Sequence, residues 1–164
     1  MIKRFFILVC AAVVIAISAA AQALDGSSTR NSMESMAEKY DDKLGVETFV
    51  FVKGRGLETM KFLLRKEMGK DFLKGVDMIV LINYSDASND TANTILSEID
   101  SITKDFRQQE LPKEMTEGKN MRNFFKLGDD GKSIHDMIII IEEETSKNVM
   151  YLGGVMKEEP SPAK

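Results

Sequence analysis

The sequence predicts an α+β fold of two layers, with three helices packed on one face of a mixed sheet and an antiparallel meander in the C-terminal half. Two observations lead to this prediction. Up to residue 108, three segments repeat their apolar residues every three or four positions, which is the period of an amphipathic helix. From residue 120 on, the period falls to two and turn residues separate the apolar segments, as in strands joined by hairpins.

Residues 1–23 have the pattern of an export signal. Lys3 and Arg4 supply positive charge, residues 5–21 are apolar or small without interruption, and Ala21-Gln22-Ala23 matches the small-x-small cleavage pattern. We predict cleavage after Ala23, and cleavage after Ala21 stays open. An uncleaved anchor is the competing interpretation, because about 17 apolar residues are at the lower limit for a membrane span. The processing site favours cleavage, which leaves a soluble chain in the periplasm or outside the cell.

Composition narrows the class of partner. The chain has 22 Lys and Arg against 26 Asp and Glu, no Trp, and no cluster of five basic residues. A nucleic-acid or anionic-membrane surface is therefore not expected, and a protein partner is favoured over nucleic acid. The single cysteine, Cys10, lies in the leader, so the processed chain has no thiol for disulfides, catalysis or metal binding. A lipoprotein signal would need a small residue where Val9 precedes Cys10.

The sequence predicts a single domain over residues 31–156. The first half of the processed chain is predicted to contain two units, each a strand followed by a helix. A polar, flexible lead-in at 24–30 is followed by a short helix that Gly45 ends. Residues 46–53 carry apolar side chains in both alternating positions, which favours an interior strand. The apolar stripe of the short helix before Gly45 consists of Met33, Met36, Ala37, Tyr40 and Leu44.

In the first unit a turn and a helix follow the strand of residues 46–53, and the second unit begins with a matching strand. Gly54-Arg55-Gly56 predicts a turn into a helix over 57–68, and residues 75–82 match residues 45–52 in character, position by position. If the two strands are parallel neighbours, a right-handed crossover joins them.

The third helix has the clearest pattern. A capping cluster at Ser88-Asn89-Asp90 precedes an apolar stripe that continues to about Gln108. Strands are then predicted over 121–127, 134–143 and 149–156, with a hairpin turn at Gly128–Gly131. The polar end, residues 157–164, predicts a disordered tail. The apolar stripe of the third helix consists of Ala92, Ile95, Leu96, Ile99, Ile102 and Phe106.

The stretch IHDMIIIIEEE, residues 134–144, contains the only histidine and three consecutive carboxylates. Its flanking turns predict an interior strand, in which Ile138 and Ile140 face one side and Ile139 and Ile141 the other. His135 and Asp136 then lie on opposite faces, and the glutamates do not converge. We interpret His135 as a surface or hydrogen-bonded residue rather than a metal ligand.

Four further motifs have a structural and a functional interpretation, and the structural one is favoured for each. Gly54–Gly56 could cradle a phosphate, but Thr59 stands where a third glycine is required, so a turn is predicted. Met33 and Met36 could bind a soft metal, but their spacing equally fits a helix core. The segment 86–90 resembles the start of a calcium loop without its sixth-position glycine and is read as a helix cap. Gly153-Gly154 indicates a bulge or a close backbone approach.

No catalytic, cofactor-binding or metal-binding residues are predicted. The chain has no G-x-S-x-G motif, and His135 is the one candidate histidine base. A pair of catalytic carboxylates leaves no short-range signature, so a small carboxylate-dependent hydrolase stays an alternative.

The order of features resembles a known family. The export signal, the helix around residues 33–40, the segment 45–52 and the closing segment 134–154 with Tyr151-Leu152-Gly153-Gly154 are together similar to the domain-of-unknown-function family 4252 (DUF 4252) of exported Bacteroides-type proteins. The resemblance covers residues 30–156. It implies an envelope setting and a single domain, and it brings no catalytic or binding residues.

The function that follows is a non-catalytic binding or interaction module of the cell envelope. The export signal and the scarcity of catalytic residues motivate it. The alternatives are the hydrolase, with His135 in a catalytic role, and an accessory protein in envelope signalling.

Overall fold

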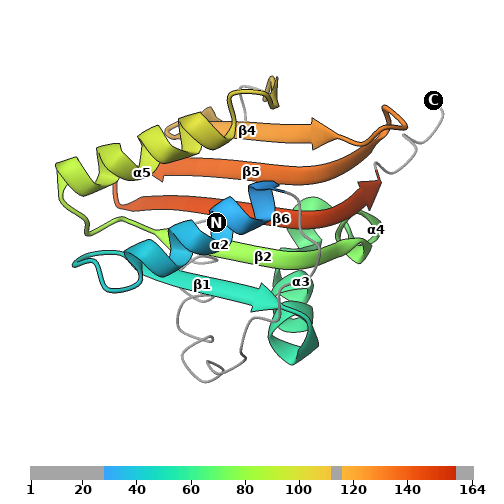
Figure 1. Cartoon of the computed structure of the whole chain (residues 1–164), viewed down its shortest axis with the longest axis horizontal. Coiled ribbons are helices and arrows are strands. Elements are labelled where there is room, and N and C mark those ends of the chain that lie inside the picture. The colour runs from blue at the N-terminus through green and yellow to red at the C-terminus, as the bar shows by residue number, and fades with distance from the viewer. Residues whose placement is uncertain (1–27, 112–115, 158–164) are drawn as a thin grey trace.

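The structure, a computed structural model, describes residues 28–111 and 116–157. The predicted leader, its cleavage site and all of the predicted tail except Lys157 lie outside these residues. None of the helices in the described ranges is long and apolar enough to cross a membrane. The elements are α2 (Ser28–Tyr40), β1 (Glu47–Val52), α3 (Gly54–Met68), α4 (Lys70–Lys74), β2 (Val76–Asn83), α5 (Asn89–Ile102), β3 (Arg107–Gln109), β4 (Asn120–Leu127), β5 (Ser133–Glu143) and β6 (Ser146–Lys157) (Figure 1).

The six strands form one sheet in the order β1-β2-β6-β5-β4-β3. All five neighbouring pairs are antiparallel. The predicted C-terminal meander is confirmed, because β4, β5 and β6 pair in chain order. The last strand also pairs with β2, so β6 joins the two halves of the chain.

Helices lie on both faces of this sheet (Figure 1). On one face, α2 and α5 pack on Val80, Ile82, Ile138 and Ile140. On the other face, α3 and α4 share a core with Ile79, Leu81, Ile139 and Ile141. Since successive strand residues point to opposite faces, the isoleucine run of β5 contributes to both cores. This confirms the interpretation of residues 134–144 as an interior strand.

The α+β class is confirmed, but the arrangement differs from the prediction in two respects. The helix stripe Leu57, Met60 and Leu64 packs on the face opposite α2 and α5, so the three predicted helices do not share one face. The sheet is antiparallel throughout rather than mixed, and no crossover joins β1 to β2. The reason is Gly69, whose φ of 83° ends α3 and lets α4 return the chain to the end of the sheet that it left.

Strand β1 lies at an edge of the sheet, and its prediction as an interior strand is wrong. Phe49 and Phe51 pack with the core on the α3 side, while Val52 packs with the core on the α2 side. Apolar residues on both faces of a strand therefore indicate that helices cover it above and below. They do not indicate whether another strand lies beside it.

Two helix boundaries differ from the sequence pattern. Helix α2 begins at Ser28, so residues 28–30 of the predicted lead-in are helical, and it ends at Tyr40, before Leu44. Helix α5 ends at Ile102 rather than near Gln108, and Arg107–Gln109 forms the short strand β3. The helical spacing continued to Phe106 because that ring still packs against the core on the α5 side.

Two local signals are confirmed. The Ser88 hydroxyl accepts a hydrogen bond from the Thr91 backbone N–H at 3.2 Å, so this segment caps α5. The register of β6 shifts against β5 between Gly153 and Met156, where β6 has one residue more than β5, and this is the predicted bulge.

Candidate functional site

A cavity of about 420 Å³ lies between α3 and α4. Its volume is within the range of sites that bind small molecules. Seven residues line it, three from α3 and four from the segment of α4: Glu58, Lys61, Arg65, Lys70, Asp71, Leu73 and Lys74.

The local sequence explains why these side chains gather. Positions 58, 61 and 65 are three and four residues apart, so they share one side of α3, beside the buried stripe of Leu57, Met60 and Leu64. The turn at Gly69 then brings α4 back against α3. Leu73 is buried in the core on this face, which fixes α4 and leaves its charged residues exposed.

The cavity carries an excess of positive charge in a chain with more acidic than basic residues. Lys61, whose side chain is only 15% exposed, forms an ion pair with Glu58 at 3.3 Å. Arg65 lies 5.2 Å from the centre of the Phe62 ring. In the described part of the chain, Arg65, Lys70 and Lys74 form no ion pair. Three cationic groups are therefore available to an anion.

The chemistry of this lining suits binding. Guanidinium and ammonium groups donate hydrogen bonds to carboxylate, sulfate and phosphate oxygens. The two carboxylates of the lining are Glu58, which Lys61 engages, and Asp71. The lining contains no serine, threonine, cysteine or histidine that could act as nucleophile or imidazole base.

His135 lies elsewhere, as the exposed third residue of β5. Its ring is close to the turn after β4, since a Cβ on Gly128 would be 2.4 Å from His135 Nε2. Ser133 and Asp130 are nearby, but the Ser133 hydroxyl donates to Asp130 Oδ1 at 2.8 Å. A catalytic triad requires the serine hydroxyl to donate to the histidine, so this arrangement is not that of a triad. Asp136 is buried on the opposite side and accepts a 2.6 Å hydrogen bond from the Tyr151 hydroxyl.

The Asp130 carboxylate instead stabilises the turn between β4 and β5. Its Oδ1 accepts hydrogen bonds from the backbone N–H groups of Ser133 and Lys132 at 2.8 and 2.9 Å. These bonds, the hydroxyl of Ser133 and the charge of His135 lower the pKa of Asp130 from 3.8 to about 2.

Because this pKa is lowered by folding, the stabilisation by Asp130 is fully present above pH 3.8 and is lost as pH falls toward 2. We expect Asp130→Asn to lower the urea midpoint at neutral pH, and the difference from the unmodified chain to shrink below about pH 4. Urea unfolding followed by circular dichroism at several pH values measures this. Asp129→Asn removes the same charge from the neighbouring exposed residue and serves as the control. A deficit for Asp130→Asn that is constant down to pH 2 would contradict the assignment.

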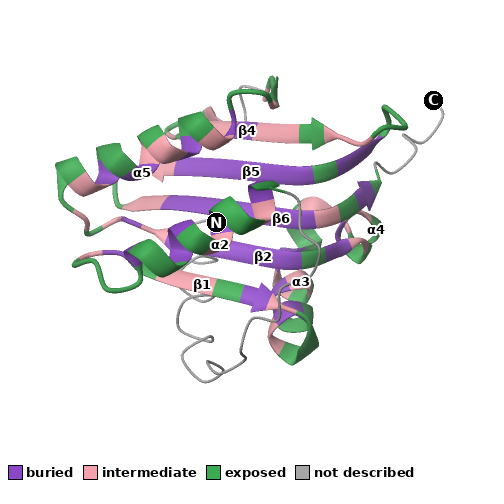
Figure 2. Ribbon diagram, viewed as in Figure 1, coloured by how far each residue is buried: buried purple, intermediate pink, exposed green. Residues whose placement is uncertain are grey.

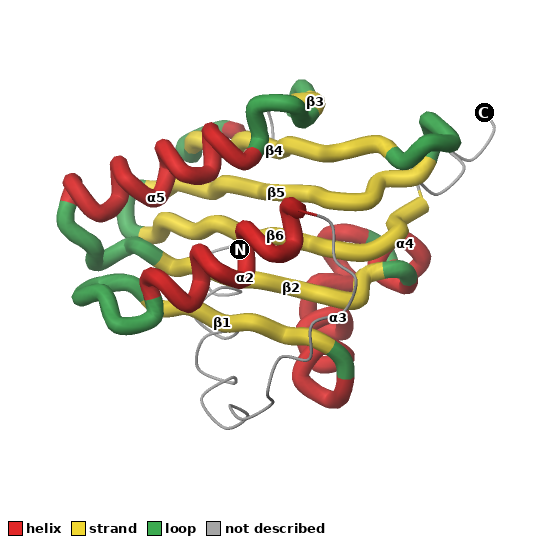
Figure 3. Tube along the Cα trace, viewed as in Figure 1, coloured by secondary structure: helices red, strands yellow, loops and turns green. Residues whose placement is uncertain are grey.

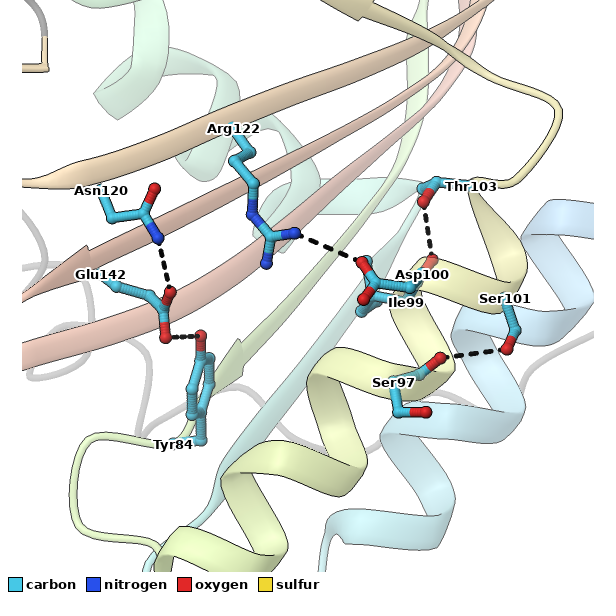
Figure 4. Close-up of polar contacts among 9 residues, drawn as sticks. All are labelled: Tyr84, Ser97, Ile99, Asp100, Ser101, Thr103, Asn120, Arg122 and Glu142. Atoms are coloured by element: carbon cyan, nitrogen blue, oxygen red, sulfur yellow. Dashed lines mark hydrogen bonds and ion pairs between the residues drawn. The ribbon is translucent and has the colours of Figure 1, made fainter.

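A second polar cluster ties α5 and the end of β2 to the sheet (Figure 4). Glu142 on β5 accepts hydrogen bonds from the Tyr84 hydroxyl at 3.2 Å and from Asn120 at 3.1 Å. Burial and the nearby Glu142 carboxylate raise the pKa of Tyr84. Arg122 on β4 pairs with Asp100 of α5 at 3.3 Å. Each contact joins two elements of the fold, so we interpret the cluster as structural.

The remaining motifs have structural roles. Met33 and Met36 are buried in the core under α2. Gly54–Gly56 forms the start of α3, after the turn at Lys53 and Gly54, which have φ values of 62° and 76°. Within residues 28–111 and 116–157, no three His, Cys, Asp or Glu side chains are placed to hold a metal ion.

The basic cavity was not predicted from the sequence. Lys61, Arg65 and Lys66 read only as the exposed side of an amphipathic helix. The available signal was the glycine at position 69, with two basic residues four positions apart on each side of it. Recognising it required knowing that the chain reverses there, which depends on φ at Gly69.

Comparisons of the chain with protein-family models, with curated proteins and with solved structures found no match.

Proposed function

We propose that this chain is an exported, non-catalytic binding module of the cell envelope that takes an anionic ligand in the cavity between α3 and α4. The observation that carries the proposal is the set of three cationic side chains, Arg65, Lys70 and Lys74, that line this cavity without an ion pair in the described part of the chain. The leader pattern and the resemblance to DUF 4252 support the envelope setting.

The ligand class follows from the donors. Arg65 presents a planar fork that matches the two oxygens of a carboxylate, sulfate or phosphate, and the two lysines add point charges. A compact anion or an anionic group on a larger small molecule fits the cavity volume of about 420 Å³. The hydrolase alternative has less support, because the side chains around His135 are engaged in a turn.

Nuclear magnetic resonance titration of the ¹⁵N-labelled chain tests the proposal. The probes are glucuronate, inorganic sulfate and inorganic phosphate, with glucose as the neutral control. We expect at least one anion to shift amide signals of residues 58–74, and the shifts to weaken as NaCl is raised, since salt screens exposed charges. The pattern across the three anions distinguishes a carboxylate ligand from a sulfate or phosphate ligand.

Two double variants decide whether the cavity is responsible. Arg65→Gln with Lys74→Gln removes two cavity charges, and we expect the dissociation constant of the preferred anion to rise about tenfold or more, as for the loss of a charge-assisted hydrogen bond. Arg55→Gln with Lys66→Gln removes two exposed charges of the same helix outside the cavity and should leave binding within about twofold. Equal losses in both variants, or no anion-specific shift at all, would overturn the proposal.

A further inference from the structure

The sheet ends in a strand with one unoccupied side. Among the described residues, β1 pairs with β2 alone. The backbone N–H and C=O groups of alternate residues of an antiparallel edge strand point away from its neighbour. Such a row of groups readily pairs with a further strand.

The two edges of the sheet are protected differently. At the opposite edge the short strand β3, whose three residues are all exposed and polar, pairs with residues 123–125 of β4 (Figure 3). Strand β1 has six residues and pairs with β2 without a register shift. Natural proteins block an edge strand with proline, with charged side chains or with a bulge. Residues 48–52 of β1 (TFVFV) have none of these features.

Exposed apolar side chains occur on β1 and on the segments next to it in the chain. Four large hydrophobic residues in the described ranges are exposed, and three of them lie on β1 or on the segments before and after it. Leu44, before the strand, is 96% exposed, Val50 is 39% exposed, and Phe62 on α3 is 63% exposed. Figure 2 shows β1 as mostly intermediate or exposed, in contrast to the buried strands beside it.

We propose that β1 pairs antiparallel with β1 of a second copy of this chain, about a two-fold axis at Val50, so that the two sheets become one. The inference is independent of the cavity ligand. In this register the two Val50 side chains face each other, and Glu47 at the start of β1 comes near Lys53 of the second copy, in the turn that follows β1, at both ends. A parallel pairing in register would instead place like charges together. Antiparallel pairing about a two-fold axis also closes the assembly at two copies.

The helices permit this arrangement. Helix α3 lies at the Val52 end of β1 and extends past the edge (Figure 1). A two-fold axis through Val50 and perpendicular to the sheet places the second α3 at the opposite end of the joined strands. That is the end where Leu44 precedes β1.

Sedimentation velocity of the chain, purified from cells that express all 164 residues, tests the proposal over a range of concentrations. We expect a concentration-dependent dimer. Val50→Lys, which sets two like charges against each other, should raise the dimer dissociation constant at least tenfold. Glu47→Lys and Lys53→Glu should each weaken the dimer, and the variant with both changes should restore it, because the opposite charges are exchanged at both ends.

The fourth exposed hydrophobic provides the control. Val155→Lys introduces the same charge on β6, an interior strand, and should leave dimerisation unchanged. Mixing Val50→Lys with Val50→Glu should give a heterodimer, which shows that Val50→Lys is folded. A chain that stays monomeric at every concentration, a dimer that is insensitive to Val50→Lys, or a failure of the double charge exchange to restore pairing would overturn the proposal.

Discussion

Replacing Gly154 by alanine is expected to lower the free energy of unfolding by about 4 kcal/mol. The backbone at Gly154 has a φ of 127°, which side chains with a Cβ rarely adopt. A Cβ there would also lie 2.2 Å from the carbonyl oxygen of Gly75, a backbone atom that cannot rotate away. We assign about 2 kcal/mol to the strained backbone and about 2 kcal/mol to the overpacking.

The contact involved holds β6 against the start of β2. The Val155 backbone N–H donates to the Gly75 carbonyl oxygen at 3.1 Å, beside the register shift between the strands. An alanine at 154 must push these backbones apart, and β6 is the strand that joins the two halves of the sheet. Since a domain of this size is stable by about 5 to 15 kcal/mol, much of its stability would be lost.

Urea unfolding at fixed protein concentration measures the change, and Gly131→Ala is the matched control. Gly131 also has a positive φ, of 66°, but a Cβ there would meet no atom within 4 Å. The control should therefore cost only about 1 to 2 kcal/mol, the penalty of a left-handed residue. Equal losses for both variants would show that the close approach to Gly75 does not matter.

The second large effect is expected at Ile140, where alanine should destabilise the fold by about 2 to 5 kcal/mol. Ile140 is completely buried on β5, between the sheet and the helical layer of α2 and α5. Shortening it removes apolar contacts and leaves a cavity that the neighbouring strands, paired on both sides of β5, cannot fill.

The same unfolding experiment tests this prediction, with Val155→Ala as the control. Val155 is 48% exposed, so its shortening should change the free energy of unfolding by less than about 0.5 kcal/mol. A loss below about 1 kcal/mol at Ile140 would mean that the core on the α5 side is loosely packed around β5.

Several elements of the fold were predicted correctly from local sequence patterns. The turn signals that flank residues 134–143 predicted the strand, and its continuous apolar run predicted that both faces are buried, because side-chain alternation is a local property of extended backbone. The cap at Ser88 and the bulge of β6 against β5 beside Gly153-Gly154 were likewise predicted, since each depends on the chemistry of one or two residues. Met33 and Met36 were correctly assigned to a core by their spacing.

The tertiary structure decided what local pattern does not encode. Residues 46–53 were predicted as an interior strand, yet β1 is an edge strand among the described residues, because helices above and below a strand give the same apolar pattern as burial within a sheet. Arg107 and Gln108 were predicted as the end of a helix and nevertheless belong to β3, because they pair with β4. The open edge at Val50 follows from strand order alone.

By itself, the sequence determined the α+β class, the positions of the main helices and strands, the C-terminal meander and the residues of the core. It did so because hydrophobic period and turn chemistry act over a few residues. Only the tertiary structure decided the side of the sheet on which each helix lies, the strand order, and the meeting of Arg65, Lys70 and Lys74 in one cavity. These depend on a chain reversal at Gly69 and on the pairing of β6 with β2, which bring together residues that no short pattern relates.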